Sequence, residues 1–523
     1  MPKQMTAVRA LAPVDLGIAV AYVLAIILVG LRLTRRDADP ADFFLAARHA
    51  RWPTIGLSLV ASNISPTALI GITGSAYALG ISVYNYEWLA AVVLAGFAIV
   101  YLPAVLASRA YTMPEFLERR YDRRIRLWFA MLTLVLNLLL DAAGTLYGGA
   151  LLLQLAVPAL SLQGAVLLLS ILAGIYAVTG GLRAVMYTEA AQAIVIIAAS
   201  LALAFLAFQA AGGLRDVIAF APPEKLSLIR PATDLTMPWT GLLFGAPVLG
   251  FYFWCNNQFM VQRMLAARSL ADGQKGALLA GALKLLTLVA FVLPGIAALK
   301  LYPGLGQSDQ AYPSLVFGLL PTGLLGILLA GFFGAMLAQL SATFNSAATI
   351  ITLDIMRGRT RMDDRTMVRF GRIATIASMG IATLWSPQIA RFPSLWQYLQ
   401  SILSYATPPV VALFAIGMLW RGANNRGAMA AVVVGSLSGV ALLALNVSGI
   451  FPVQFLHVAA IVFASSAVAL VVGSLSYHPV SAIAENSGVG QTMAGFSIDA
   501  TPGVLWSAAG LMVATAAIVI AFR

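Results

Sequence analysis

The stretch Ser62-Asn63-Ile64-Ser65-Pro66-Thr67 interrupts an apolar run that extends from residue 52 to residue 79. Proline removes a helical hydrogen bond, and neighbouring serine and asparagine side chains can satisfy the backbone groups that it frees. The pattern therefore predicts a membrane helix that is broken near its middle. A second polar stretch, Trp254-Cys255-Asn256-Asn257-Gln258, interrupts the run at 240–262, five runs later along the chain.

Two interrupted helices in corresponding positions favour one architecture in particular. They are typical of transporters that are built from two inverted repeats and hold their binding site at the midplane of the membrane. The alternative interpretation is a pair of polar kinks that only stabilise a helix bundle.

The composition of the whole chain points to a membrane protein. Of the 523 residues, 60% are hydrophobic and 10% are charged, and the mean hydropathy is +0.89, which is outside the range of soluble domains. A helix needs about 20 residues to cross the hydrocarbon core. We therefore predict an all-α membrane protein with about 14 transmembrane helices, near residues 13–34, 52–79, 84–107, 126–155, 160–179, 188–211, 240–262, 276–300, 323–353, 368–387, 394–418, 425–446, 453–475 and 503–521.

The net charge of +12 is distributed unevenly over the loops. One alternating set of loops carries 23 of the 32 basic residues, the other set and the tails carry 8, and the last is Lys284 inside a span. The positive-inside rule places the basic set in the cytoplasm and both termini outside. We therefore expect a multi-pass protein of the cytoplasmic membrane, in contact with lipid, and no nucleic-acid partner, because the basic residues lack recognition-helix or aromatic context.

Enzyme chemistry has no support in the sequence. Cys255 is the only cysteine, and His49, His457 and His478 are too scattered to form a metal site by local spacing. No nucleophile elbow, phosphate-binding loop or zinc-protease motif occurs. We expect a protein that is not an enzyme, and the sequence gives no indication of its oligomeric state.

Polar residues at membrane depth mark the candidate site. Such residues are costly in lipid and usually face a partner or a water-filled cavity, so they trace a polar path through the membrane. Six of them lie within or at the ends of the apolar runs: Asn63, Glu87, Asp141, Glu189, Lys284 and Gln400.

Several short motifs, in a constant order from about residue 40 to residue 430, resemble the sodium/solute symporter family. The sodium/glucose cotransporter branch is the most similar. The residues that carry the resemblance are Phe43-Phe44-Leu45-Ala46-Ala47-Arg48, Ser58-Leu59-Val60-Ala61-Ser62-Asn63-Ile64-Ser65, Tyr86-Glu87-Trp88, Thr112-Met113-Pro114-Glu115-Phe116-Leu117, Gly180 to Gln192, Gln262-Arg263, Lys284, and Asn345 to Ile355.

The resemblance implies a five-plus-five inverted repeat. We expect residues 1–51 to hold the outer N-terminus, the first helix and a cytoplasmic loop, and residues 52–211 to form the first repeat. The outer loop would cover 212–239, the second repeat 240–420, and three C-terminal helices 421–523. The implied function is secondary active transport of a small polar organic solute, with a sugar favoured, into the cell by sodium symport.

The resemblance also implies a solute site. Glu87 matches the carboxylate of the "YEW" segment, Lys284 the lysine of the eighth span, and Gln400 the glutamine of the "YLQS" segment. Asn63 of the broken second span belongs to the same set, and Asp141 is a further contact or a packing partner of Lys284. The alternative is that Glu87 and Lys284 form a buried ion pair that holds two helices together.

The implied sodium site is less complete. The family holds sodium with backbone oxygens, here of Ala61, Ile64 and Ala335, and with two hydroxyl side chains that are replaced here by Ala338 and Gln339. A hard cation prefers oxygen ligands, so Gln339 could contribute its amide oxygen, whereas alanine has none in its side chain.

Glu189 stands where the family has an aspartate and is a candidate for a second ion or for a proton. Two coupling ions therefore remain open: sodium at a remodelled site, or protons carried by Glu189, Asp141 or Glu87. The alternative functions are a proton-coupled or uncoupled carrier of a carboxylate or amino acid and a membrane-embedded solute sensor. We expect the sensor less, because the sequence ends at Arg523 directly after the last helix.

Overall fold

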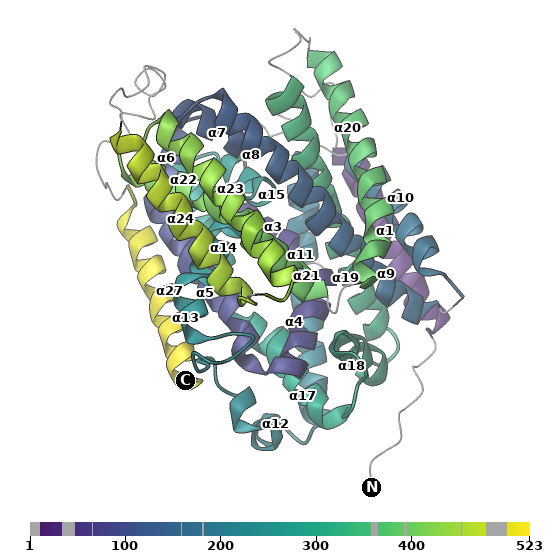
Figure 1. Cartoon of the computed structure of the whole chain (residues 1–523). Coiled ribbons are helices and arrows are strands. Elements are labelled where there is room, and N and C mark those ends of the chain that lie inside the picture. The colour runs from purple at the N-terminus through teal and green to yellow at the C-terminus, as the bar shows by residue number, and fades with distance from the viewer. Residues whose placement is uncertain are drawn as a thin grey trace.

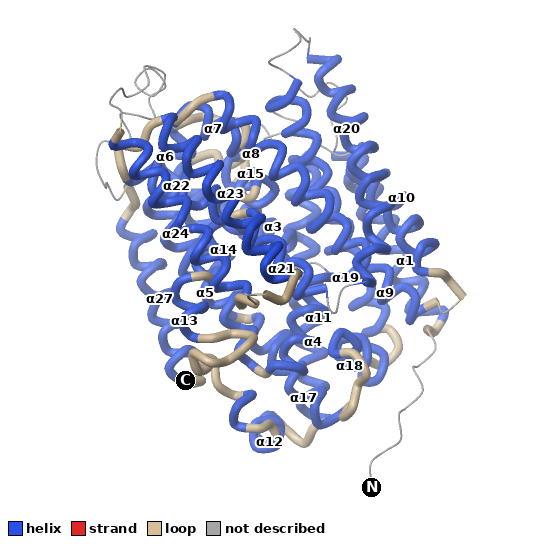
Figure 2. The backbone as a smooth tube through the Cα atoms, viewed as in Figure 1, coloured by secondary structure: helices blue, strands red, loops and turns tan. Residues whose placement is uncertain are grey.

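The computed structural model describes residues 11–33, 48–64, 66–157, 159–179, 182–356, 364–391, 395–450, 452–476 and 499–523. Helices dominate these residues, and the only extended pairings among them are two isolated bridges (Figure 2). The predicted all-helical class is confirmed. Most of the motif at 43–48 and part of the basic loop at 357–372 lie outside the described residues, as do residues 1–10 of the N-terminus.

The helices follow one another along the chain. Those before residue 212 are α1 (Pro13–Leu33), α3 (Trp52–Asn63), α4 (Pro66–Leu79), η2 (Ile81–Tyr84), α5 (Asn85–Gly96), η3 (Phe97–Tyr101), α6 (Leu102–Ala107), α7 (Met113–Arg120), α8 (Arg123–Leu136), η4 (Asn137–Ala142), α9 (Ala143–Ala156), α10 (Leu162–Thr179) and α11 (Leu182–Ala210).

The remaining helices are α12 (Leu214–Phe220), η5 (Pro223–Lys225), α13 (Trp239–Phe244), α14 (Ala246–Phe251), η6 (Tyr252–Asn256), α15 (Gln258–Leu265), α16 (Leu270–Leu285), η7 (Leu288–Val292), α17 (Leu293–Leu301), η8 (Ser308–Gln310), α18 (Ala311–Leu319), α19 (Leu324–Thr349), η9 (Ile350–Met356), α20 (Asp364–Trp385), η10 (Ser386–Arg391), α21 (Leu395–Ala406), α22 (Pro408–Leu419), α23 (Asn425–Val447), α24 (Phe455–Leu475) and α27 (Pro502–Ala521). In Figure 1, α7 lies at one end of the helix bundle and α12 at the opposite end.

Eight helical stretches in the described residues are long and apolar enough to cross a membrane, and two bent pairs raise this number to ten. The eight are Ile81–Ala107, Arg123–Gln154, Met186–Ala210, Leu270–Leu301, Leu324–Thr352, Asn425–Val447, Phe455–Leu475 and Pro502–Ala521. The multi-pass character is thus confirmed, while the count of fourteen stays a prediction.

The break in the second span is present. Helix α3 ends at Asn63, α4 begins at Pro66, and the two helices are bent by 60° against each other. Ile64 leaves the helical conformation with ψ of 75° while its N–H still bonds to Val60 O at 2.8 Å. Because Pro66 cannot donate a backbone hydrogen bond, the chain ends one helix and starts another here.

The seventh span is also interrupted where the sequence predicts it. Helix α14 passes into the π-helical turn η6, Asn257 is extended with ψ of 123°, and α15 starts at Gln258. A third break, of 50° between Tyr398–Ala406 and Pro408–Leu419, was not predicted. The sequence Thr407-Pro408-Pro409 carries its signal, since neither proline has a backbone N–H to donate and a proline ring clashes with the preceding helical turn.

Neighbouring helices closely approach α3, which ends at the first break. Helix α3 packs against α16, α11 and α19. At the crossing of α3 and α16, a Cβ at Gly56 would lie 2.7 Å from Leu279 Cδ2, and one at Gly276 would lie 2.6 Å from Ile55 Cγ2. Only glycine fits at this distance, and in membranes such small residues allow the van der Waals packing on which helix association depends.

The connection at 212–239 is fixed to the end of α4. Lys225 Nζ donates to Tyr77 O at 2.8 Å, and the Arg230 guanidinium donates to Leu79 O. Both cations thus meet the free carbonyls at a helix C-terminus, where positive charge is favourable.

An acidic turn stiffens the same connection. Asp234 accepts hydrogen bonds from the Thr236 hydroxyl at 2.7 Å and from the backbone N–H groups of Thr236 and Met237 at 2.8 Å. Burial raises the pKa of Asp234, but these hydrogen bonds and the charge of Arg230 outweigh it and hold the pKa below its usual value.

Candidate functional site

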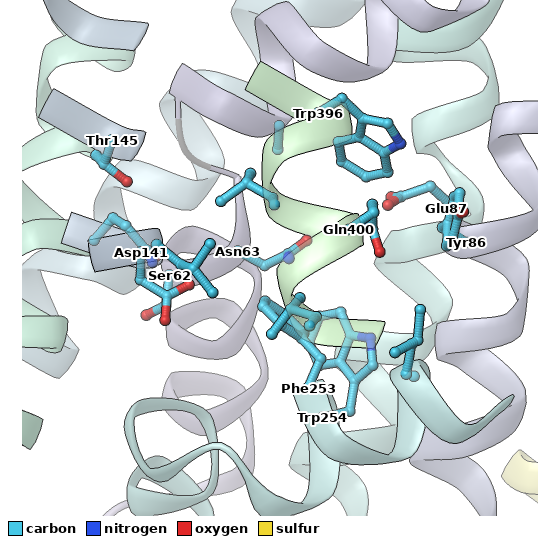
Figure 3. A pocket seen from close by; sticks show the side chains of 17 residues that line it. Ser62, Asn63, Tyr86, Glu87, Asp141, Thr145, Phe253, Trp254, Trp396 and Gln400 are labelled. Atoms are coloured by element: carbon cyan, nitrogen blue, oxygen red, sulfur yellow. The ribbon is translucent and has the colours of Figure 1, made fainter. Parts of the chain in front are cut away.

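A cavity lies beside the breaks in the second and seventh spans. Its volume of about 130 Å³ has room for several waters or a small solute, since one water needs about 10–15 Å³ of this measure. It is lined by Ser62, Asn63, Ala68, Tyr86, Glu87, Leu140, Asp141, Thr145, Leu249, Gly250, Phe253, Trp254, Gln339, Trp396, Leu399, Gln400 and Leu403 (Figure 3).

Three of the predicted solute residues meet on one wall of this cavity. Asn63 comes from the last residue of α3, Glu87 from the first turn of α5, and Gln400 from α21. Figure 3 shows Gln400 between Asn63 and Glu87. The broken helix therefore brings an amide to a carboxylate that lies just 24 residues further along the chain, and α21 adds a second amide.

Lys284 does not line the cavity but lies behind this wall. Its ammonium group forms an ion pair with Glu87 Oε2, donates to Asn63 Oδ1 at 2.5 Å and lies 5.6 Å from the centroid of the Trp254 ring. The side chains of Lys284 and Glu87 are 2% and 6% exposed. The predicted ion pair thus exists, and Lys284 orients the two residues that face the cavity.

Aromatic side chains form two ends of the cavity. The rings of Tyr86 and Trp396 meet edge to face at 5.3 Å between centroids, and those of Phe253 and Trp254 also lie 5.3 Å apart. In Figure 3 the Trp396 ring lies on one side of Gln400 and the Phe253 and Trp254 rings lie on the other. Trp396 was not identified from the sequence, although it precedes Gln400 by one helical turn.

The opposite wall holds a second polar group. Asp141 of η4 and Thr145 of α9 lie there (Figure 3), and Gln339 of α19 also lines the cavity. Asp141 accepts a hydrogen bond from the Asn257 amide. Among the described residues no lysine or arginine forms an ion pair with Asp141, and Lys284 pairs with Glu87 instead.

The residues predicted for sodium lie on α3 and α19, which pack against each other. Ala61 and Ala335 are fully buried and Ile64 is 2% exposed. Gln339 is 4% exposed, and its Oε1 atom has no hydrogen-bond partner among the described residues. Its side chain lines the solute cavity.

Glu189 of α11 is fully buried in an ion pair. Arg263 Nη2 lies 2.5 Å from Glu189 Oε1, and Arg263 Nε lies 3.1 Å from Oε2. Ser58 donates to Oε2, and the Ser62 hydroxyl lies 3.2 Å from Oε1. Both carboxylate oxygens of Glu189 are therefore bound by protein groups, and neither side chain of the pair is exposed.

Comparison with known proteins decides the family. The model of the sodium:solute symporter family matches residues 43–435. The chain belongs to this family. It is 35% identical over 478 residues to sodium/myo-inositol cotransporter 2 of Mus musculus, an alignment that covers 84% of this chain and 71% of that protein.

Two further relatives cover more of both chains. The sodium/mannose cotransporter of Bos taurus is 33% identical over 526 residues, with 90% of this chain and 88% of that protein covered. Sodium/glucose cotransporter 1 of Oryctolagus cuniculus is 30% identical over 525 residues, with 89% and 79% covered. The protein is a membrane transporter and not an enzyme, as the sequence analysis predicts.

Solved structures show the same fold. A Na⁺-coupled sialic acid symporter in a substrate-bound outward-open state superposes with a TM-score of 0.79 at 20% identity, and covers 90% of this chain and 99% of its own. The nucleobase-cation-symport-1 family transporter MHP1 superposes with a TM-score of 0.53 at 16% identity, and covers 88% and 99%.

Proposed function

We propose that this protein imports a small, uncharged, polyhydroxylated solute, a sugar or a cyclitol, by symport with sodium. The observation that carries the proposal is the cavity at the two helix breaks. It presents Asn63, Glu87 and Gln400 between two sets of aromatic rings.

The chemistry of this wall suits hydroxyl groups. Each hydroxyl of a sugar donates one hydrogen bond and accepts others, so a dry site needs both kinds of partner. The amides of Asn63 and Gln400 donate and accept, and the Glu87 carboxylate accepts. The rings of Trp396 and Trp254 can cover the less polar faces of the solute, as aromatic side chains do in many ligand sites.

The charge of the cavity argues against an organic carboxylate as the solute. Two carboxylates, Glu87 and Asp141, line the cavity, and no lysine or arginine is among its described lining residues. The charge of Lys284 is already balanced by Glu87. A negatively charged solute would meet repulsion without a cationic partner, and like charges in a site of low dielectric constant are strongly unfavourable.

The relatives support the same solute class. Their names record myo-inositol, mannose and glucose as cotransported with sodium. Those solutes are uncharged and rich in hydroxyl groups, which is the class that the cavity favours.

Proton coupling through Glu189 is disfavoured by the contacts of its carboxylate. Both of its carboxylate oxygens are bound, chiefly by Arg263. Protonating Glu189 would leave the Arg263 guanidinium buried without a counter-charge, which typically costs several kcal/mol. We therefore assign Glu189 a structural role, and place the sodium ion near the break in α3, with Gln339 and the carbonyls of Ala61, Ile64 and Ala335 as candidate ligands.

For this function we propose the fourteen-helix arrangement, in the cytoplasmic membrane, with both termini on its outer side. We propose repeats at 52–211 and 240–420, an outer loop at 212–239, and flanking segments at 1–51 and 421–523. Alternating access would then arise from rocking of one helix bundle around the broken helices.

Uptake by proteoliposomes tests the proposal. The purified protein is reconstituted and offered labelled hexoses, inositols, carboxylates and amino acids, each with and without an inward sodium gradient. We expect accumulation of one or more uncharged polyols that collapses when the gradient is removed. Accumulation of a carboxylate or amino acid driven by protons would support the rival carrier. Saturable binding of a polyol without any uptake would support the solute sensor.

A further inference from the structure

The cavity contains one carboxylate whose charge is not balanced by the protein. Asp141 is half-buried, accepts a hydrogen bond from Asn257, and has no ion-pair partner among the described residues. The other cavity carboxylate, Glu87, is neutralised by Lys284. A carboxylate without a cation at membrane depth is costly, so it favours binding of a positive charge.

Two uncharged side chains with oxygen atoms line the same cavity. The Gln339 Oε1 atom is buried and lacks a hydrogen-bond partner in the described part of the chain. Thr145 is 2% exposed, follows Asp141 by four residues and lines the same cavity. Helix α19, which carries Gln339, packs directly against η4 and α9, which carry Asp141 and Thr145. A carboxylate, an amide oxygen and a hydroxyl are ligands that hard cations prefer.

The position expected for sodium from the family resemblance offers fewer side-chain oxygens. Ala338 has none, and Gln339 extends toward the solute cavity. In that position Gln339 would be the one candidate side-chain ligand beside backbone carbonyls, and the site would hold no negatively charged ligand. Asp141, which lines the solute cavity, would supply a negatively charged ligand.

We infer that Asp141 and Gln339 provide side-chain ligands of the coupling sodium ion, in the same cavity that receives the solute. The inference rests on the proposed sodium symport. Asp141 is thereby assigned to the ion, and Asn63, Glu87 and Gln400 are assigned to the solute.

This arrangement gives a direct mechanism of coupling. Sodium at Asp141 turns a negatively charged cavity into a neutral one, which lowers the cost of closing the site around an uncharged solute. By thermodynamic linkage, the solute then raises the affinity for sodium by the same factor. Ion and solute are coupled because they share one cavity, and no movement between distant sites is needed.

Binding of radioactive sodium to the purified full-length protein, without solute, tests the inference. Asp141→Asn removes the charge, and Gln339→Met removes the amide oxygen at nearly constant volume. Asp216→Asn is the matched control, because it removes the same charge from the exposed helix α12, where the Asp216 side chain is 58% exposed. Size-exclusion chromatography establishes that each variant is folded before binding is measured.

We expect Asp141→Asn to raise the half-saturating sodium concentration more than about tenfold, the effect of losing one charged ligand. Gln339→Met should raise it about threefold or more, and Asp216→Asn should leave it unchanged. If Asp141→Asn does not fold, Gln339→Met alone decides the question. Sodium binding that is unchanged in the folded variants, or lowered as much by Asp216→Asn, would overturn the inference.

The two proposals can fail separately. Sodium-driven polyol uptake together with normal sodium binding in both cavity variants would leave the proposed function intact and refute the ion site. Sodium binding that depends on Asp141, in a protein that transports no polyol, would support the ion site and refute the proposed function. Wild-type protein that shows no saturable sodium binding would overturn both.

Discussion

Removing the Glu87–Lys284 ion pair one charge at a time should separate its structural role from its role in transport. Each side chain is almost fully buried, at 6% and 2% exposure, so a single neutralising substitution leaves the other charge without a partner. Such a loss typically costs about 3–5 kcal/mol of unfolding free energy. We expect Glu87→Gln and Lys284→Met each to fall in this range. Lys284→Met also removes the hydrogen bond to Asn63.

The double variant provides the control for this loss. When both charges are removed, no buried charge remains uncompensated, and a buried pair replaced by uncharged groups of similar volume is often nearly neutral in stability. We therefore expect the double variant to recover most of the lost free energy, to within about 2 kcal/mol of the wild type. Solute uptake should not recover, because Glu87 lines the cavity and Lys284 orients Asn63.

Stability can be followed through the only cysteine of the chain. Cys255 is buried, so a thiol-reactive dye labels it when the protein unfolds in a denaturant titration in detergent. Uptake is measured with the same preparations in proteoliposomes. The reasoning would be refuted by a Lys284→Met variant as stable as the wild type, or by a double variant that transports with wild-type KM. A double variant less stable than both single variants would also contradict it.

Three further outcomes follow from the structure. Gln400→Ala should raise the KM for the transported solute about tenfold in uptake assays without changing expression, since it removes a cavity amide at little structural cost. Gly276→Ala should lower the unfolding free energy by about 1–3 kcal/mol, because its Cβ would overlap Ile55, whereas Gly96→Ala, which meets no atom within 4 Å, should not. Asp234→Asn should lower the thermal midpoint at pH 7, and this difference should shrink as the pH falls below about 4. The depressed pKa of Asp234 means that its contribution is present above the unfolded value of about 3.9 and is lost as the pH falls through the folded value.

The sequence predicted those features that local chemistry determines. Pro66 and the pair Asn256-Asn257 predicted the interruptions of two spans, and both are present. The third break was missed because Pro408 was read as part of one continuous span. Proline within an apolar run can end a helix or only bend it, and the neighbouring helices decide between the two.

Side-chain direction was harder to predict than residue identity. The resemblance to the family selected Glu87, Lys284 and Gln400, and two of these face the cavity. Lys284 lies behind the wall because the close approach of α3 and α16 places it beside Asn63. Which face of a helix meets a cavity depends on packing between distant segments, and a single sequence does not record it.

The same limit explains the residues that the sequence analysis missed. The aromatic ends of the cavity come from three separate helical segments, and each ring alone is unremarkable in an apolar run. Gln339 was selected for a position between α3 and α19, and its place in the lining of the cavity that Asp141 also lines appears only once α19 and η4 are packed together.

Charge movement on solute addition is the most direct test of the central claim, that an uncharged polyol enters together with sodium. Proteoliposomes are adsorbed to a solid-supported membrane, and the current is recorded when a polyol accepted in the uptake panel is added. The account predicts an inward positive current in sodium and none when potassium replaces sodium. Polyol uptake without any current in sodium, or an equal current in both cations, would contradict it.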